Sequence, residues 1–234
     1  NPCRSQKGSL DMNQTRGSLI KNLLMVTLGM FPLSFGVYIT IQAGIGVSPW
    51  DALALGLAKT FGISYGTGNI LIGLTVVVLD LLLREPIGPG TIVNAILLGK
   101  LVDLFRWIPP QESWLTGIPM MIAGWFLVGF GQYLYMRPAL GSGPRDSLMV
   151  ALKRRIRRIP IGIISVMILV TVAFLGWLLG GSIGIGTLIS VFLAGPIMQL
   201  VFRWVAFDAT AVRHQGILTS VRVLLKGKMS ETDR

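Results

Sequence analysis

Two aspartates in matching surroundings are the first candidates for chemistry in this sequence. Asp51 closes the segment GIGVSPWD at Gly44–Asp51, and Asp146 closes ALGSGPRD at Ala139–Asp146. An acid just after a proline-containing helix start offsets the positive end of that helix, which typically contributes about 0.3–1 kcal/mol. If the two helix starts converge, their carboxylates could instead bind a cation, a proton or a polar solute. Capping and binding both remain open on the sequence.

The two segments are copies of one motif. Each is followed by a second glycine signature, IGPGT at Ile87–Thr91 and IGIGT at Ile183–Thr187. Such collinear similarity indicates a tandem duplication. We therefore add the aligned tyrosines to the candidate site residues, and take the glycines and prolines as the elements that shape the short helices. The aligned pairs are Gly46 with Gly141, Pro49 with Pro144 and, upstream, Tyr38 with Tyr133.

A second candidate site contains Lys100 and Asp103. Counted from Gly90 at 1.5 Å per residue, Lys100 lies about 15 Å into a bilayer core about 30 Å thick. Asp103 is three residues further on and can share a helix face with it. Ionisable groups inside the membrane indicate function by default, although a structural ion pair is the alternative. Asn94, one helical turn from Thr91, is a further polar candidate whose ordinary role is packing between helices.

The residue inventory limits the possible chemistry. The chain has one cysteine, Cys3, and one histidine, His214, in a basic segment near its C-terminal end. A Ser-His-Asp triad within the membrane, an internal disulfide and a multi-cysteine metal site are therefore excluded. We expect no enzyme activity, no cofactor and no metal.

The composition is that of an all-α polytopic membrane protein. The 234 residues are 52% hydrophobic and 13% charged, with a mean hydropathy of +0.69, whereas soluble domains have about 25% charged residues. Apolar runs long enough to cross a bilayer as helices recur along the chain. The six predicted spans are Ile20–Gln42, Gly66–Leu83, Thr91–Trp107, Trp114–Met136, Ile161–Leu179 and Ile185–Val205.

The duplicated segments begin two shorter helices, Ser48–Phe61 and Gly143–Arg158. Both are too short to cross, so we predict half-helices that are re-entrant or interfacial. Basic residues cluster at both termini and in the second half-helix, which places all three on the cytoplasmic side of the plasma membrane. With three spans per copy, the repeats are inverted, a plan common among transporters. The rival is a pair of parallel four-span repeats, which would bury the basic residues of the second half-helix.

These predictions divide the chain into a cytoplasmic tail (1–19), a first membrane repeat (20–110), a second membrane repeat (111–206) and a basic cytoplasmic tail (207–234). The spacing of apolar residues in the last segment favours an amphipathic helix on an anionic membrane surface. The net charge is +11, and the basic residues that produce it cluster at the ends of apolar runs. The expected partners are therefore the bilayer, anionic lipids and an unknown small solute, with no nucleic acid.

The motif GIGVSPWDAL followed by SYGTGN, together with the IGxGT signature, resembles the YitT/YczE family of bacterial integral membrane proteins. The similarity extends from about Thr27 to Trp204 and is looser in the second copy, where Arg145 replaces Trp50. The resemblance implies a plasma-membrane location and suggests transport. We therefore expect a small secondary transporter or exporter of an organic solute. The alternative is a membrane protein that supports or regulates a partner.

Overall fold

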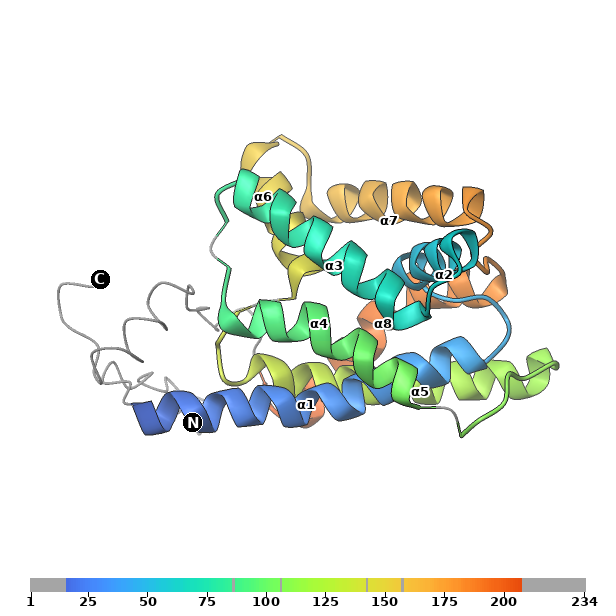
Figure 1. Ribbon diagram of the computed structural model, residues 1–234, viewed down its shortest axis with the longest axis horizontal. Coiled ribbons are helices and arrows are strands. Elements are labelled where there is room, and N and C mark those ends of the chain that lie inside the picture. Colours follow the sequence, from blue (N-terminus) through green and yellow to red (C-terminus); the bar gives the residue numbers. More distant parts are fainter. Residues whose placement is uncertain (1–15, 86, 106, 142, 157, 208–234) are drawn as a thin grey trace.

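The computed structural model describes residues 16–85, 87–105, 107–141, 143–156 and 158–207. Within these residues all regular structure is helical, which confirms the all-α prediction (Figure 1). The predicted amphipathic helix of the C-terminal tail lies outside the described residues. The helices are α1 (Arg16–Gln42), α2 (Pro49–Phe61), α3 (Tyr65–Leu82), α4 (Pro89–Leu104), α5 (Trp114–Met136), α6 (Pro144–Arg155), α7 (Ile161–Leu178) and α8 (Ile185–Trp204).

Both copies of the motif start a short helix at the predicted proline. Pro49 and Pro144 are the first residues of α2 and α6, where the absent N–H of proline costs no hydrogen bond. The Ser48 hydroxyl accepts a hydrogen bond from the Asp51 N–H at 3.4 Å, as a helix N-cap does. Gly143 takes the same place before α6 and has no side chain with which to cap that helix. With 13 and 12 residues, the two helices are only about 18–20 Å long.

Five of the described helices are long and apolar enough to cross a bilayer, namely α1, α3, α5, α7 and α8. The remaining predicted span, Thr91–Trp107, forms α4, which has 16 residues and ends at Leu104. A helix of that length measures about 24 Å, which is less than the bilayer core of about 30 Å. The multi-pass helical class is therefore established, whereas the count of six spans remains a prediction.

Helices α1 and α5, the first helix of each copy, pack side by side in opposite directions (Figure 1). A Cβ atom on Gly36 would lie 2.7 Å from the Val128 nitrogen, and one on Gly117 would lie 2.4 Å from the Ala43 oxygen. Small residues at such a contact let two helix backbones approach closely. These glycines of α1 and α5 are thus explained by packing.

Matching contacts connect the two halves of the chain. The Gly90 N–H donates to the Leu140 carbonyl at 2.9 Å, and the Gly186 N–H donates to the Ile45 carbonyl at 2.8 Å. These two hydrogen bonds are counterparts, because Gly90 aligns with Gly186 and Leu140 aligns with Ile45. In the same way, α2 packs on α7 and α6 packs on α3. Each half therefore holds the short helix of the other.

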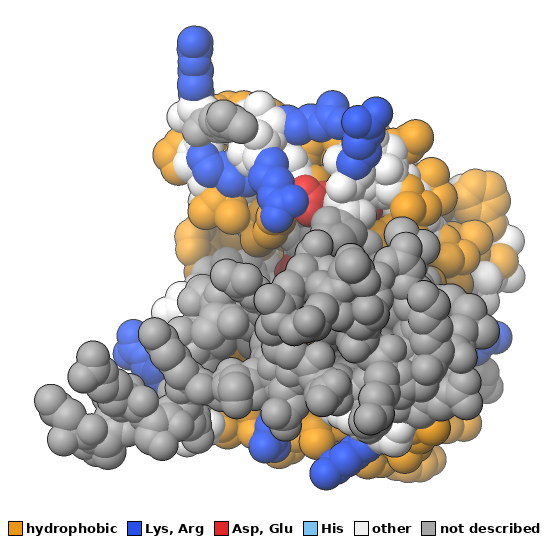
Figure 2. Space-filling view, turned by 90° about the vertical axis from the view of Figure 1, so that its left-hand side faces the viewer, with side chains coloured by type: hydrophobic (Ala, Val, Ile, Leu, Met, Phe, Trp, Pro, Cys, Tyr) orange, Lys and Arg blue, Asp and Glu red, His pale blue; other side chains and the backbone are white. Residues whose placement is uncertain are grey.

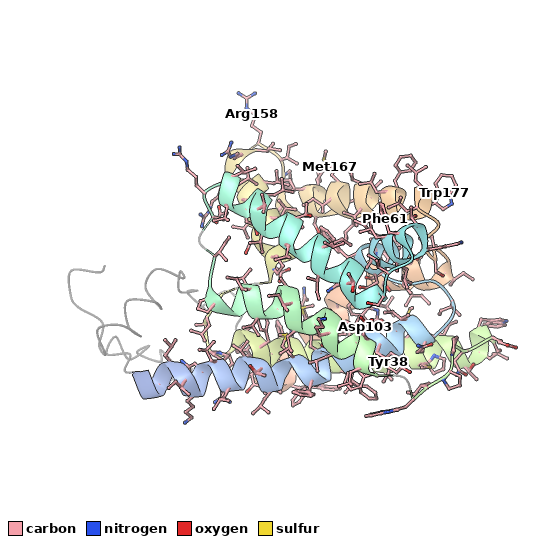
Figure 3. The ribbon with its side chains drawn as sticks, viewed as in Figure 1. Tyr38, Phe61, Asp103, Arg158, Met167 and Trp177 are labelled. Carbon is pink, nitrogen blue, oxygen red and sulfur yellow. The ribbon has the colours of Figure 1, made fainter. Side chains whose placement is uncertain are left out.

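Basic side chains gather at one end of the molecule. Figure 2 looks onto this end, where Lys and Arg side chains spread over its upper part. Arg154, Arg155 and Arg158, at the end of α6 and just beyond it, are exposed. Arg158 and Trp177 mark opposite ends of α7 (Figure 3). Between them α7 exposes large apolar side chains such as Val170 and Phe174, which fits a helix that faces lipid.

Candidate functional site

The starts of the two half-helices meet at one polar pocket. It has a volume of about 220 Å³. Asp51 and Asp146, which the sequence made the leading candidates, both line it. Residues of α1, α3, α4, α5 and α8 form the rest of the wall. The polar side chains of the lining are Ser48, Asp51, Asn69, Asn94, Gln132, Arg145 and Asp146.

Asp51 is 4% exposed, and the described residues give its carboxylate three partners. The Ser48 hydroxyl donates to Oδ2 at 2.5 Å, and the Tyr65 hydroxyl donates to Oδ1 at 2.8 Å. The Arg145 guanidinium lies 3.9 Å from Oδ1. Because hydrogen bonds to a charged group are stronger than those between neutral groups, this network fixes the start of α2 against α3 and α6. Asp51 therefore has both a capping position and a charge partner from the other half.

Arg145 is the centre of the polar pocket. Its Nη2 donates to the Asn69 side-chain oxygen at 2.5 Å, and its guanidinium carbon lies 5.1 Å from the centre of the Trp50 ring. This distance is typical of a cation–π contact. Trp50 and Arg145 have the same position in the two motif copies. A substitution that loosens the motif in sequence thus creates a contact between the halves.

The Asp146 carboxylate has fewer contacts than the Asp51 carboxylate. Its side-chain hydrogen bond is with the Gln132 amide, at 3.4 Å from Oδ2. Arg145 is adjacent in sequence but directs its guanidinium to Asn69, Trp50 and Asp51. Among the described lining residues, the charged ones are two aspartates and one arginine, a formal charge of −1. Such a lining favours a cation or the positive end of a dipolar solute.

Of the remaining candidates, Asn94 lines the pocket and the two tyrosines do not. The Tyr38 hydroxyl donates to the Ile108 carbonyl at 2.8 Å and accepts from the Ile108 N–H at 2.9 Å, so it anchors the segment after α4. Tyr133 packs its ring edge-on to Phe207, with ring centres 5.3 Å apart. The alignment of the tyrosines reflects the duplication, while their contacts are those of packing residues.

Lys100 and Asp103 lie away from the pocket, and the Lys100 side chain is exposed. The Asp103 carboxylate accepts hydrogen bonds from the Ser64 hydroxyl at 2.5 Å and the Gly66 N–H at 2.8 Å. It therefore stabilises the start of α3. Because α4 ends at Leu104, Lys100 lies about 6 Å from the end of the helix and not at its middle.

The motif glycines and prolines shape the walls around the pocket. Gly46 has φ +102° and Gly141 has φ +130°, backbone angles that side chains disfavour. A Cβ atom on Gly46 would lie 2.5 Å from the Gly184 nitrogen, and one on Gly141 would lie 2.6 Å from the Thr91 hydroxyl oxygen. Each motif glycine thus allows the turn to press against the glycine signature of the other half.

The sequence did not single out Tyr65 or Gln132 as site residues, and it did not predict that Asp80 is buried. Tyr65 lies in the SYGTGN stretch quoted for the first motif, which was its available signal. Gln132 sits next to Tyr133, and no pattern singled it out. The spacing of Asp80 and Arg84 predicts a local pair, yet Asp80 is fully buried and its carboxylate has no hydrogen-bond partner among the described residues. Arg84 lies beyond the end of α3, where its backbone has φ +59°.

A helical chain with several apolar helices of membrane-crossing length is a polytopic membrane protein. Residues 20–203 match the model of a family described as "Family of unknown function (DUF6198)", so the chain belongs to this family. The resemblance to YczE-type membrane proteins is thereby confirmed. No group of three or more potential metal ligands occurs among the described residues.

Three curated relatives cover most of this chain. The Bacillus subtilis "Uncharacterized membrane protein YczE" is 36% identical over 174 residues, which are 73% of this chain and 80% of the relative. An "Uncharacterized protein" of Haemophilus influenzae is 28% identical, covering 80% of this chain and 85% of the relative. The B. subtilis "Uncharacterized protein YyaS" is 29% identical, covering 74% of this chain and 88% of the relative. No solved structure matches the chain.

Proposed function

We propose that the protein is a small secondary transporter of an organic solute in the plasma membrane. In this proposal six spans form two inverted three-helix repeats, both termini lie in the cytoplasm, and the polar pocket is the solute site. The protein has no enzyme activity in this proposal. The observation that carries it is the polar pocket, which is lined by one motif aspartate from each half.

The reciprocal contacts support the inverted repeats. Paired hydrogen bonds from Gly90 to Leu140 and from Gly186 to Ile45 are what a pseudo-twofold axis would produce. The antiparallel packing of α1 and α5 fits such an axis in the membrane plane. Transporters of this plan bind solutes where broken or short helices meet between the repeats. The basic end in Figure 2 would face the cytoplasm under the positive-inside rule.

The alternative role, support of a partner protein, also has an observation in its favour. The carboxylate of Asp51 is occupied by Ser48, Tyr65 and Arg145, as in a network that serves only to hold the fold. A closed structural network would admit no solute. Access to the pocket from water therefore separates the two functions.

The test uses single cysteines in a Cys3→Ser background, reconstituted in vesicles. Asn94→Cys and Gln132→Cys place a thiol in the wall of the polar pocket. Thr40→Cys is the matched control, because Thr40 is 2% exposed and does not line that pocket. A transporter should let a small charged thiol reagent reach the pocket cysteines from either side, applied separately, and leave position 40 unmodified.

Reaction of positions 94 and 132 from one side only, or from neither, would contradict alternating access and favour the supporting role. A change in the rate of modification when candidate organic cations are added would in addition identify solutes that enter the pocket.

A further inference from the structure

A second, larger cavity lies between α3 and α7. It has a volume of about 910 Å³, near the upper end of the range of about 300–1,000 Å³ for ligand pockets. We call it the apolar chamber. Its lining comes from α2, α3, α6 and α7 with the segments after α2 and α6 and is aliphatic or aromatic apart from two threonines. The Thr75 and Thr171 hydroxyls both donate to carbonyls of their own helices, at 2.8 Å, so neither needs a polar ligand.

The apolar chamber is open on its outer side. Phe61, Leu79 and Met167 line it and are also exposed, whereas Ile72 and Val172 line it and are buried. Figure 3 shows Phe61 on α2 and Met167 on α7. On a chain of this class an apolar opening between two helices faces the hydrocarbon of the bilayer. A ligand would enter it from the lipid.

The apolar chamber and the polar pocket have a common wall. Trp50 lines both. On α3, Asn69 lines the polar pocket and Ile72 the chamber, and on α6, Arg145 lines the polar pocket and Leu148 the chamber. Residues three apart are neighbours on one helix face, so both helices change from polar to apolar within a single turn. This boundary fits a molecule with a polar head and an apolar tail.

The charges of the polar pocket select the head. Arg145, the basic side chain among the described lining residues, is already engaged by Asp51, Asn69 and Trp50, so an anionic head would have to compete with Asp51 for it. Within the described part of the chain, the side-chain hydrogen bond of Asp146 is the 3.4 Å contact from Gln132. An ammonium group could therefore bind the Asp146 carboxylate. It would also balance the formal charge of −1.

We propose that the two cavities together bind a single-chain amphiphile, with an alkyl tail in the apolar chamber and an ammonium head at Asp146. This inference rests on the proposed function and deepens it, since it names the class of solute that the transporter would carry. Moving an alkyl chain from lipid into an apolar cavity gains little, because both environments exclude water. Selectivity must therefore come from the head and from the shape of the chamber.

The experiment measures binding and needs no transport. Purified protein in phosphatidylcholine vesicles is photolabelled with a dodecylamine that carries a diazirine in its chain, and the labelled peptides are identified by mass spectrometry. We expect labelling of the chamber lining on α3 and α7. Unlabelled dodecylammonium should compete about tenfold better than dodecyl sulfate or dodecanol, the change that corresponds to one charge-assisted hydrogen bond.

Two variants test the parts separately. Thr75→Trp with Thr171→Trp fills the apolar chamber from two exposed positions and should abolish chamber labelling. Leu74→Trp is the matched control, since Leu74 is exposed on α3 outside the chamber, and it should leave labelling unchanged. Asp146→Asn should keep the labelled positions but reduce the preference for the ammonium head to less than about twofold.

Equal competition by dodecyl sulfate, or chamber labelling that survives the double tryptophan variant, would overturn the proposal. Labelling no stronger in the chamber than on the lipid-facing side of α7 would do so as well. Amine binding together with one-sided access of positions 94 and 132 would refute transport and leave the amphiphile site intact. Two-sided access without chamber labelling would refute only the amphiphile.

Discussion

Asp51 and Asp146 have the same place in the two copies of the motif, yet their carboxylates have different surroundings. The Asp51 carboxylate accepts hydrogen bonds from the hydroxyls of Ser48 and Tyr65 and lies beside the Arg145 guanidinium. The Asp146 carboxylate accepts a hydrogen bond from the Gln132 amide, which at 3.4 Å is longer than either hydrogen bond to Asp51. The surroundings differ because the second copy has Gly143 in place of Ser48 and Arg145 in place of Trp50. In our proposal Asp51 serves the structure and Asp146 serves binding.

This difference predicts unequal effects of neutralisation. Asp51→Asn removes the counter-ion of Arg145 and weakens two short hydrogen bonds, so we expect a loss of about 1–3 kcal/mol in the free energy of unfolding. Asp146→Asn removes a first-turn acid with a weak amide contact and should cost about 1 kcal/mol or less. Thermal unfolding in detergent measures both variants. Equal shifts, or a larger shift for Asp146→Asn, would refute the division of roles.

At the scale of the helices, local signals specified the starts of the two short helices, whereas contacts between distant segments did not follow from such signals. The Ser-Pro start of α2 and the Gly-Pro start of α6 were predictable from residue types alone. The end of α4 at Leu104 and the role of Asp103 were not. Asp103 binds the start of α3, 37 residues earlier in the chain, and no periodicity reports a contact of that kind.

The contact predicts that Asp103 matters to the fold and Lys100 does not. Asp103→Ala removes the acceptor of the Ser64 hydroxyl and of the Gly66 N–H, so we expect a loss of about 1–2 kcal/mol, as for a lost N-cap. Lys100→Met changes an exposed side chain and should stay within about 0.5 kcal/mol. Denaturation of both variants in the same detergent measures this. A larger cost for Lys100→Met would restore the predicted charge site.

The glycine turns before the half-helices make a second prediction at this scale. Gly141→Ala forces a side chain into φ +130° and against Thr91 and Gly88, so the cost should exceed about 2 kcal/mol. A Cβ atom added to Gly195, inside α8, would meet nothing within 4 Å among the described residues. Gly195→Ala should therefore be neutral or stabilise by about 0.5–1 kcal/mol. The yield of monodisperse protein and its unfolding temperature compare the two. Similar values would show that the turn tolerates rearrangement.

At the scale of the whole molecule, the duplication in the sequence left the convergence of the two helix starts as one of two hypotheses and did not predict the contacts made there. The two aspartates do line one pocket, which is one of the two outcomes that the repeat left open. Tyr65, Gln132 and the stacking of Arg145 on Trp50 arise from side-chain packing across the halves. The apolar chamber was equally invisible, since helices rich in leucine and isoleucine look the same in sequence whether or not a space lies between them.

The proposed inversion makes a prediction about the membrane as a whole. Lys59 lies in the last turn of α2 and Arg155 in the last turn of α6, so these positions mark the same end of the two short helices. If the repeats are inverted, Lys59 faces the outside and Arg155 the cytoplasm, where the remaining basic residues gather. Lys59→Cys and Arg155→Cys are made one at a time in a Cys3→Ser background. An impermeant thiol reagent applied to intact cells should modify position 59 and reach position 155 only after permeabilisation. Parallel four-span repeats would put both positions on the same side, so labelling of both from outside, or of both only after permeabilisation, would decide for them.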